Sequence, residues 1–239
     1  MSNTYLIVID PSTRHPEVEV CEQIIHSSPS DVILIRPALS PSDRLEALGV
    51  ESLWEVDIER VCGVIILGGG ASPNDQLTWQ SELKDWLTDS SGPIVHQLPM
   101  LGVCYGHQLL GHLCGGKVDF LWDEHCEKGI RYISLTEDLF GLDAHHKVPL
   151  IVSHREGLVT LPVGWRSLTA TPQIQSNGAY TPVVAYEAIA HNQHPWWGFQ
   201  AHIDATSMFL INNQIPVSLP EPYLGKVMIN TFIDIVIHT

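Results

Sequence analysis

Basic residues are scarce in this sequence. Lys and Arg number 12 against 27 Asp and Glu, which gives a formal net charge of −15 at pH 7. A chain this acidic, with its basic residues scattered rather than clustered, is poorly suited to bind the phosphates of a nucleic acid. Charged residues of both signs make up only 16% of the chain, which argues against a disordered or coiled-coil protein. We therefore expect a folded protein with no nucleic-acid partner.

Long apolar runs are absent as well. The amino terminus, MSNTYLIVID, carries no basic residue ahead of its apolar run, so it predicts a first strand rather than a signal peptide. No segment approaches the roughly 18 consecutive apolar residues of a membrane span. The five cysteines have irregular spacing and predict no disulfide framework. These absences favour a cytoplasmic protein with no membrane partner.

The chain does have enough apolar residues for a large core, 44% of 239 residues. That length suits one large α/β domain and is short for two. No linker, repeat or low-complexity segment divides the sequence. We expect a single domain over residues 1–239.

The first half alternates apolar strands with amphipathic stretches. Helices are expected at residues 17–25 and 80–88, and a third should follow Cys104 and end at Gly115 and Gly116. This alternation predicts an α/β fold with an open, mostly parallel twisted sheet and helices on both faces. The predicted strands of this half are residues 4–9, 31–36, 61–67 and 99–103.

The second half is richer in strands, which Gly, Pro and Asn turns connect. A helix that starts near Pro222 is expected to pack on the sheet, and residues 191–197 predict a hairpin turn between two strands. The predicted strands of this half are residues 129–135, 148–153, 165–171, 182–190 and 195–202.

Cys104 lies on a glycine-flanked corner, in the stretch PMLGVCYGHQLLG. The pattern Gly102-x-Cys104-x-Gly106 falls where a predicted strand gives way to a predicted helix. Such a turn needs glycines because a β-carbon at either position would collide with the neighbouring backbone. The helix also points its first N–H groups and its positive dipole end at the thiol, which favours a thiolate. The pattern indicates a nucleophile; a small buried cysteine on an ordinary turn is the alternative.

A thiol nucleophile needs a base, and His202 stands out among the 13 histidines. It ends a predicted strand in PWWGFQAHID, and Asp204 follows two residues later. In an extended chain these two side chains point to the same side, so the carboxylate could hold the imidazole in one tautomer. The alternative is a structural histidine at a sheet edge.

A glycine run follows the third predicted strand in ILGGGASP. Its backbone N–H groups could stabilise an oxyanion together with the amide of Tyr105. Ligands of parallel α/β sheets bind outside the carboxyl ends of the strands. We therefore expect residues 68–70, Cys104 and His202 to meet at that edge.

These segments together resemble a known family, the class I (triad) glutamine amidotransferases. The similarity extends over residues 61–204 and implies the flavodoxin-like fold of that family. The segment around Cys104 is the most specific part of it. The segments that carry the resemblance are GVIILGGGASP, PMLGVCYGHQLLGHLCGGKV, VSHREGLVTLP and PWWGFQAHID.

The resemblance implies roles for individual residues. Cys104 would attack the side-chain amide of glutamine, form a γ-glutamyl thioester and release ammonia. His202 would be the general base and acid, and Asp204 would orient it. Backbone amides of Gly70 and Tyr105 would form the oxyanion hole. The implied substrate-binding residues are Gly69, Gln108, Ser153 and His154.

Two positions depart from the family pattern. The third member of the triad is usually Glu, in a His-Pro-Glu run, and here it is Asp204. Its side chain is one methylene shorter, so either the backbone shifts or the carboxylate contributes less. The proline usual after the glycine pair is Ala71 here, a departure that concerns the oxyanion loop and not the nucleophile.

The resemblance leaves three functions open. The first is a glutaminase subunit that passes ammonia to a separate synthase partner, because the amidotransferase-like unit takes up the whole chain. The second is a free-standing hydrolase of γ-glutamyl peptides or amides, and the third is an inactive binding module. No cofactor is implied. Residues 123–127 and 143–147 contain metal-capable side chains without paired ligand spacing, so no metal site is expected.

Overall fold

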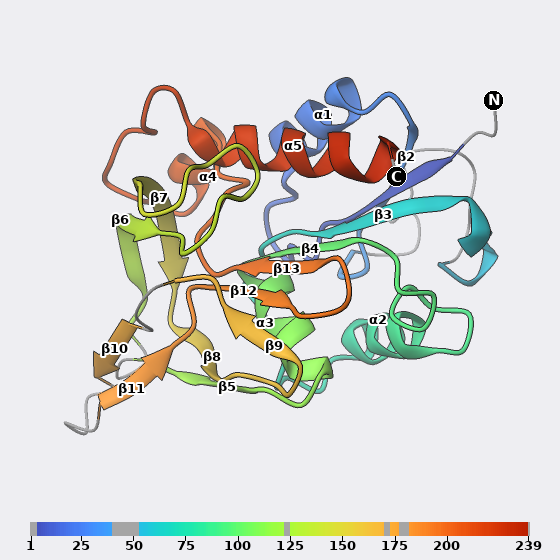
Figure 1. The fold of residues 1–239 in the computed structure, drawn as a ribbon, viewed down its shortest axis with the longest axis horizontal. Coiled ribbons are helices and arrows are strands. Elements are labelled where there is room, and N and C mark those ends of the chain that lie inside the picture. The colour runs from blue at the N-terminus through green and yellow to red at the C-terminus, as the bar shows by residue number, and fades with distance from the viewer. Residues whose placement is uncertain (1–3, 40–52, 122–124, 170–172, 177–181, 239) are drawn as a thin grey trace.

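The computed structural model describes residues 4–39, 53–121, 125–169, 173–176 and 182–238. Within these residues, seven strands form a central sheet in the order β2-β1-β3-β4-β13-β12-β9 (Figure 1). The strands from β2 to β13 pair in parallel, whereas β12 is antiparallel to both of its neighbours. The strands in spatial order are Asp31–Ile35, Tyr5–Ile9, Val61–Ile66, Met100–Val103, Trp196–Phe199, Ala188–His191 and Trp165–Ser167.

Helices cover both faces of this sheet. Figure 1 shows α1 and α5 on one side of the sheet and α2 and α3 on the other. Alternate strand residues face opposite ways: Leu6 and Val8 join the core that α1 and α5 cover, and Ile7 joins the core under α2 and α3. The expected α/β fold with a mostly parallel sheet is confirmed. The α-helices of the described residues are α1 (Val18–Ser27), α2 (Thr78–Thr88), α3 (Tyr105–Leu113), α4 (Ser207–Asn212) and α5 (Leu224–His238), and short 3₁₀ helices form at Leu53–Glu55 and Ile58–Arg60.

In the described part of the chain, three antiparallel strand pairs lie outside the central sheet. An isolated bridge between Ile151 and His202 joins one of them to the chain that follows β13. The residues after β13 are therefore fixed by a second sheet as well as by the first. The pairs are β5 (Lys117–Phe120) with β8 (Glu156–Thr160), β6 (Glu127–Ser134) with β7 (Lys147–His154), and β10 (Gln173–Ser176) with β11 (Pro182–Ala185).

Three predicted strands differ from the observed ones. The strand expected at residues 165–171 is β9, which ends at Ser167, and residues 170–171 lie outside the described residues. The strand expected at residues 182–190 is two strands, β11 and β12, because β11 pairs with β10 while β12 joins the central sheet. The strand expected at residues 195–202 ends at Phe199. Beyond it, the amide of His202 donates to the carbonyl of Ile151 at 2.7 Å, so the chain leaves the central sheet for β7.

Candidate active site

Cys104 lies at the junction of β4 and α3. Its φ of 46° and ψ of −97° form a backbone conformation that residues with a side chain rarely adopt. A Cβ on Gly102 would lie 2.5 Å from the carbonyl carbon of Gly106, and one on Gly106 would overlap the backbone of Ile66. The prediction that a β-carbon at either glycine would collide with the neighbouring backbone is confirmed. The corner is tight and holds Cys104 in one place.

His202 and Asp204 are hydrogen-bonded partners. His202 Nδ1 lies 3.0 Å from Asp204 Oδ1, and both side chains are buried. The chain between them is not extended: the segment turns, and the amide of Ala205 donates to the carbonyl of His202 at 3.1 Å. The backbone turn places the Asp204 carboxylate within hydrogen-bond distance of the imidazole.

The electrostatics of His202 favour its charged form. Burial disfavours the imidazolium, but the side chains of Cys104 and Asp204 each attract and hydrogen-bond it. These interactions outweigh burial and raise the pKa of His202 well above its ordinary value of 6.5. The ring therefore bridges the thiol and the carboxylate as a proton carrier can.

Neighbouring residues hold the His202 backbone and ring. The Tyr223 hydroxyl donates to the carbonyl of His202 and accepts from the amide of Ile151 at 3.3 Å. The ring of Phe209, at the start of α4, lies 4.3 Å from the His202 ring between centroids. These contacts restrain the backbone of His202 and one face of its imidazole ring.

The glycine loop after β3 contacts both His202 and Asp204. The amide of Gly68 donates to Asp204 Oδ2 at 3.2 Å, and a Cβ on Gly68 would lie 2.5 Å from His202 Cε1. Gly69 lies against Pro11, where a Cβ would meet Pro11 Cγ at 3.0 Å. Gly70 is exposed. The loop thus lies at the carboxyl ends of the strands, as expected. Within the loop, Gly68 is in closest contact with His202 and Asp204.

Gln108 lies inside α3, one turn beyond Cys104, and is buried. Its Nε2 donates to the carbonyl of Glu156 at 2.8 Å and to Gln200 Oε1 at 3.1 Å. Gln200 Nε2 in turn lies 3.6 Å from Cys104 Sγ. The resemblance assigns Gln108 to substrate binding, and in the structure its amide nitrogen is hydrogen-bonded within the protein.

Ser153 and His154 end strand β7. His154 is buried, and burial together with the positive charges of Arg131, His202 and His107 lowers its pKa to about 3. His154 is thus neutral at physiological pH. Ser153 is half-buried, and its Oγ lies 3.9 Å from Cys126 Sγ.

Tyr105 directs its side chain away from Cys104. The hydroxyl accepts a hydrogen bond from Gln80 Nε2 at 3.3 Å, and the ring lies 5.9 Å from that of Trp79, between centroids, under α2. Tyr105 belongs to the core on one face of the sheet and Cys104 to the core on the other. The backbone amide is therefore the part of Tyr105 placed beside the thiol.

Glu17 is a carboxyl whose charge interacts with those of Asp204 and His202, and the sequence did not reveal it. It immediately precedes α1, and its amide donates to Asp10 Oδ2 at 2.9 Å. Burial and the negative charge of Asp204 raise the pKa of Glu17 to about 8, against the opposing effect of His202. Glu17 and Asp204 belong to opposite ends of the chain, so no local pattern connects them. Gln200 is a second residue that the sequence analysis did not single out. Its signal was local, because it is a polar residue within the segment that contains His202.

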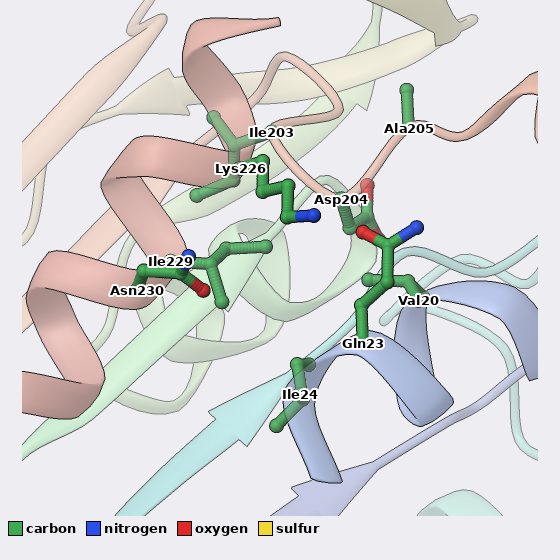
Figure 2. A pocket seen from close by; sticks show the side chains of 9 residues that line it. All are labelled: Val20, Gln23, Ile24, Ile203, Asp204, Ala205, Lys226, Ile229 and Asn230. Carbon is green, nitrogen blue, oxygen red and sulfur yellow. The ribbon is translucent and has the colours of Figure 1, made fainter. Parts of the chain in front are cut away.

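A pocket opens beside Asp204 between α1 and α5 (Figure 2). In Figure 2 the amino end of Lys226 extends from α5 toward Asp204 and Gln23. Asp204 belongs to this pocket, but Cys104 and His202 do not line it. The residues around it are Val20, Gln23, Ile24, Ile203, Asp204, Ala205, Lys226, Ile229 and Asn230.

The described residues hold neither a metal cluster nor a membrane-spanning helix. Across the described ranges, no group of three or more His, Cys, Asp or Glu side chains is arranged to hold a metal ion. In the same part of the chain, no helix combines the length and hydropathy that crossing a membrane requires. Residues 123–124, in one of the polar segments considered for metal binding, lie outside the described residues.

Comparison with known proteins identifies relatives of the chain. The family model for glutamine amidotransferase class-I matches residues 44–208, more than half of the chain. A GMP synthase (glutamine-hydrolyzing) of Staphylococcus carnosus is 31% identical over 168 residues, which are 66% of this chain and 29% of that protein. The enzyme of the same name from Aquifex aeolicus is 29% identical over 172 residues, 68% of this chain and 30% of that protein. The chain thus spans less than a third of these relatives.

Solved structures share the fold over most or all of the chain. A glutamine amidotransferase of Thermotoga maritima superposes with a TM-score of 0.71 at 16% identity and covers 100% of both chains. A glutamine amidotransferase of Methylobacillus flagellatus gives 0.60 at 19% identity and covers 89% of this chain and 74% of the other. These likenesses establish the fold, and the family match establishes the relationship. The chain belongs to the class I glutamine amidotransferases.

Proposed function

We propose that this protein hydrolyses the side-chain amide of glutamine through a γ-glutamyl thioester on Cys104. The observation that carries the proposal is the buried hydrogen-bonded series of Cys104, His202 and Asp204, at the carboxyl ends of β4 and β13. A nucleophile, a base and a group that orients the base form the arrangement that acyl transfer requires.

The reaction has two steps. The Cys104 thiolate attacks the amide carbon, the carbon–nitrogen bond breaks, and His202 gives its proton to the leaving nitrogen, which departs as ammonia. Water then loses a proton to His202 and attacks the thioester carbon. The carbon–sulfur bond breaks, which releases glutamate and restores the thiolate. Asp204 keeps the imidazole in the orientation that both transfers need.

Backbone and side-chain groups at the same edge complete the proposed site. The amides of Gly70 and Tyr105 stabilise the oxyanion, and the start of α3 adds its positive dipole end. Gly69 and Gln108 bind the glutamine from the loop and the helix. Both N–H groups of the Gln108 amide are engaged within the protein, so this residue offers its oxygen as an acceptor.

The Ser153–His154 segment binds the α-amino and carboxylate groups of glutamine in this proposal. The bridge between Ile151 and His202 supports it, because that pairing places the end of β7 next to the base. The neutral state of His154 also suits a residue that contributes backbone contacts rather than charge.

The released ammonia passes to a separate synthase partner. The curated relatives are GMP synthases, and this chain matches only 29–30% of their length. A cytoplasmic location fits the five free cysteines. Residues 1–239 act as one domain, since residues of β1 and of α5 share a core.

The test compares wild-type protein with the Cys104→Ala variant on a panel of glutamine, γ-glutamyl peptides and γ-glutamyl amides. We expect release of ammonia and glutamate from glutamine, and the loss of essentially all turnover in Cys104→Ala. The control is Cys114→Ala, a half-buried cysteine directly after α3. Substantial activity in Cys104→Ala would refute the assigned nucleophile. Faster hydrolysis of a γ-glutamyl peptide than of glutamine would instead favour the free-standing hydrolase.

A further inference from the structure

We infer that Gln200 is a catalytic residue that donates a hydrogen bond to the Cys104 thiolate, and that Gln108 fixes the direction of this donation. The inference rests on the proposed function of Cys104. Gln200 Nε2 lies 3.6 Å from Cys104 Sγ, within the range for a hydrogen bond to sulfur. Gln200 follows β13 directly and is almost fully buried, with an exposed fraction of 1%.

The direction of the amide follows from its neighbours. An amide side chain can present either its oxygen or its nitrogen, so its orientation has to be read from its partners. The carbonyl of Glu156 is a backbone acceptor, and it therefore faces the nitrogen of Gln108 at 2.8 Å. The second N–H of that nitrogen is directed to Gln200 Oε1 at 3.1 Å. With its oxygen occupied, Gln200 presents its nitrogen to the sulfur.

Burial gives this donor its effect. The residues that these hydrogen bonds join, from Glu156 to Cys104, are all buried. The bonds therefore act in a medium of low dielectric constant. The backbone of Gln200 is fixed too, because its amide donates to the carbonyl of Glu187 at 2.8 Å. A hydrogen bond to an ionised acceptor is stronger than one to a neutral acceptor, so the donor favours the thiolate over the thiol.

The same bond acts at both chemical steps. Sulfur is negatively charged before it attacks the amide and again when it leaves the thioester. In the thioester itself that charge is gone, so the donor stabilises the two charged states more than the intermediate. Gln200 therefore assists the departure of the sulfur in the second step and keeps the nucleophile ionised before the first.

The test measures alkylation of Cys104 by iodoacetamide as a function of pH, followed by mass spectrometry of the peptide that contains Cys104. The peptide readout is needed because Cys126 is exposed and will react as well. In Gln200→Met, which has similar volume and no N–H donor, we expect the midpoint of the profile to rise by about one pH unit. The control is Gln193→Met, an exposed glutamine of the β12–β13 turn, whose midpoint should equal that of wild type.

A double-variant cycle tests the role of Gln108. Gln108→Met removes the group that directs Gln200, so we expect the midpoint to rise by less than in Gln200→Met. The double variant should then match Gln200→Met, because Gln108 acts on the thiol through Gln200. If Gln200→Met fails to fold, as circular dichroism will show, an unchanged midpoint in Gln108→Met still refutes the inference.

The outcomes separate this inference from the proposed function. A wild-type midpoint as high as that of a free thiol would contradict the activated nucleophile itself. A low wild-type midpoint that Gln200→Met leaves unchanged would overturn the role of Gln200 and leave the nucleophile standing. A merely structural role for Gln200 predicts lower thermal stability without any shift of the pH profile.

Discussion

The Asp204 carboxylate accepts a hydrogen bond from the backbone amide of Gly68, 136 positions earlier in the chain, at 3.2 Å. Its other oxygen lies 3.0 Å from His202 Nδ1. With one partner on each oxygen, the carboxylate has a fixed orientation toward the imidazole. The glycine loop therefore contributes to the alignment of His202 as well as to the proposed oxyanion hole.

Asp204→Asn tests whether this carboxylate orients His202. The amide can still meet the Gly68 amide through its oxygen, but it would present N–H to the imidazole or force the wrong tautomer. We expect kcat for glutamine hydrolysis to fall by roughly 10²- to 10⁴-fold, with thermal stability nearly retained. An unchanged rate would mean that another acidic residue, or none, serves His202.

Gly68→Ala tests the packing of the loop against the base. The new Cβ would lie 2.5 Å from His202 Cε1 and 3.5 Å from Cys104 Cβ, so the imidazole must move away from the thiol. Small displacements of catalytic groups cost about 10²-fold in rate, and we expect at least that loss in kcat/KM.

The matched control for Gly68→Ala is Gly63→Ala, on β3, the strand that precedes the loop. Its Cβ would meet the side chain of Val236 at 3.2 Å, far from the thiol. This variant should lose some stability while its activity per folded molecule stays that of wild type. Equal activity in both alanine variants would show that Gly68 needs no empty space beside His202.

Glu17→Gln tests the second carboxyl near the site through the pH dependence of stability. The pKa of Glu17 is about 8 in the folded protein against an ordinary 4.5. Between these values the folded state keeps a proton that the unfolded chain has lost, so this residue lowers stability as pH rises. Thermal unfolding should show Glu17→Gln gaining Tm relative to wild type from pH 5 to pH 8.

The control for this prediction is Glu22→Gln, an exposed carboxyl on α1. Its Tm difference from wild type should stay the same across that pH range. If the Glu17→Gln difference is also constant between pH 5 and pH 8, then Glu17 is ionised in the folded protein at neutral pH.

Ser72 and Glu156 connect the glycine loop to β8. The Ser72 hydroxyl donates to a carboxylate oxygen of Glu156, and both residues are buried. Ser72→Ala leaves that oxygen without its donor, so we expect the free energy of unfolding to fall by about 1–3 kcal/mol. Urea denaturation measures this change, with the exposed Ser81→Ala as control. Strictly additive losses in a cycle with Glu156→Gln would show that the two side chains are not coupled.

The elements of the first half could be predicted because their signals are local. Each buried strand is a short apolar run, and α1 was expected at residues 17–25 and observed at Val18–Ser27. The corner at Cys104 was also readable, because a strand followed by G-x-C-x-G and an apolar helix restricts the backbone within a few residues. The prediction that the strand continues beyond Phe199 was wrong, because the path of the chain there depends on β7, which lies elsewhere in the sequence.

The sequence by itself determined the family and the tight corner at Cys104, and it predicted His202 and Asp204 as partners of the thiol. Residue types and short spacings carry that information, because they set backbone conformation and chemistry locally. The tertiary structure alone decided that Asp204 reaches His202 through a turn, that Gly68 holds its second oxygen, and that Gln200 faces the thiol. Those contacts join segments far apart in the chain, and only packing of the sheet and its helices brings them together.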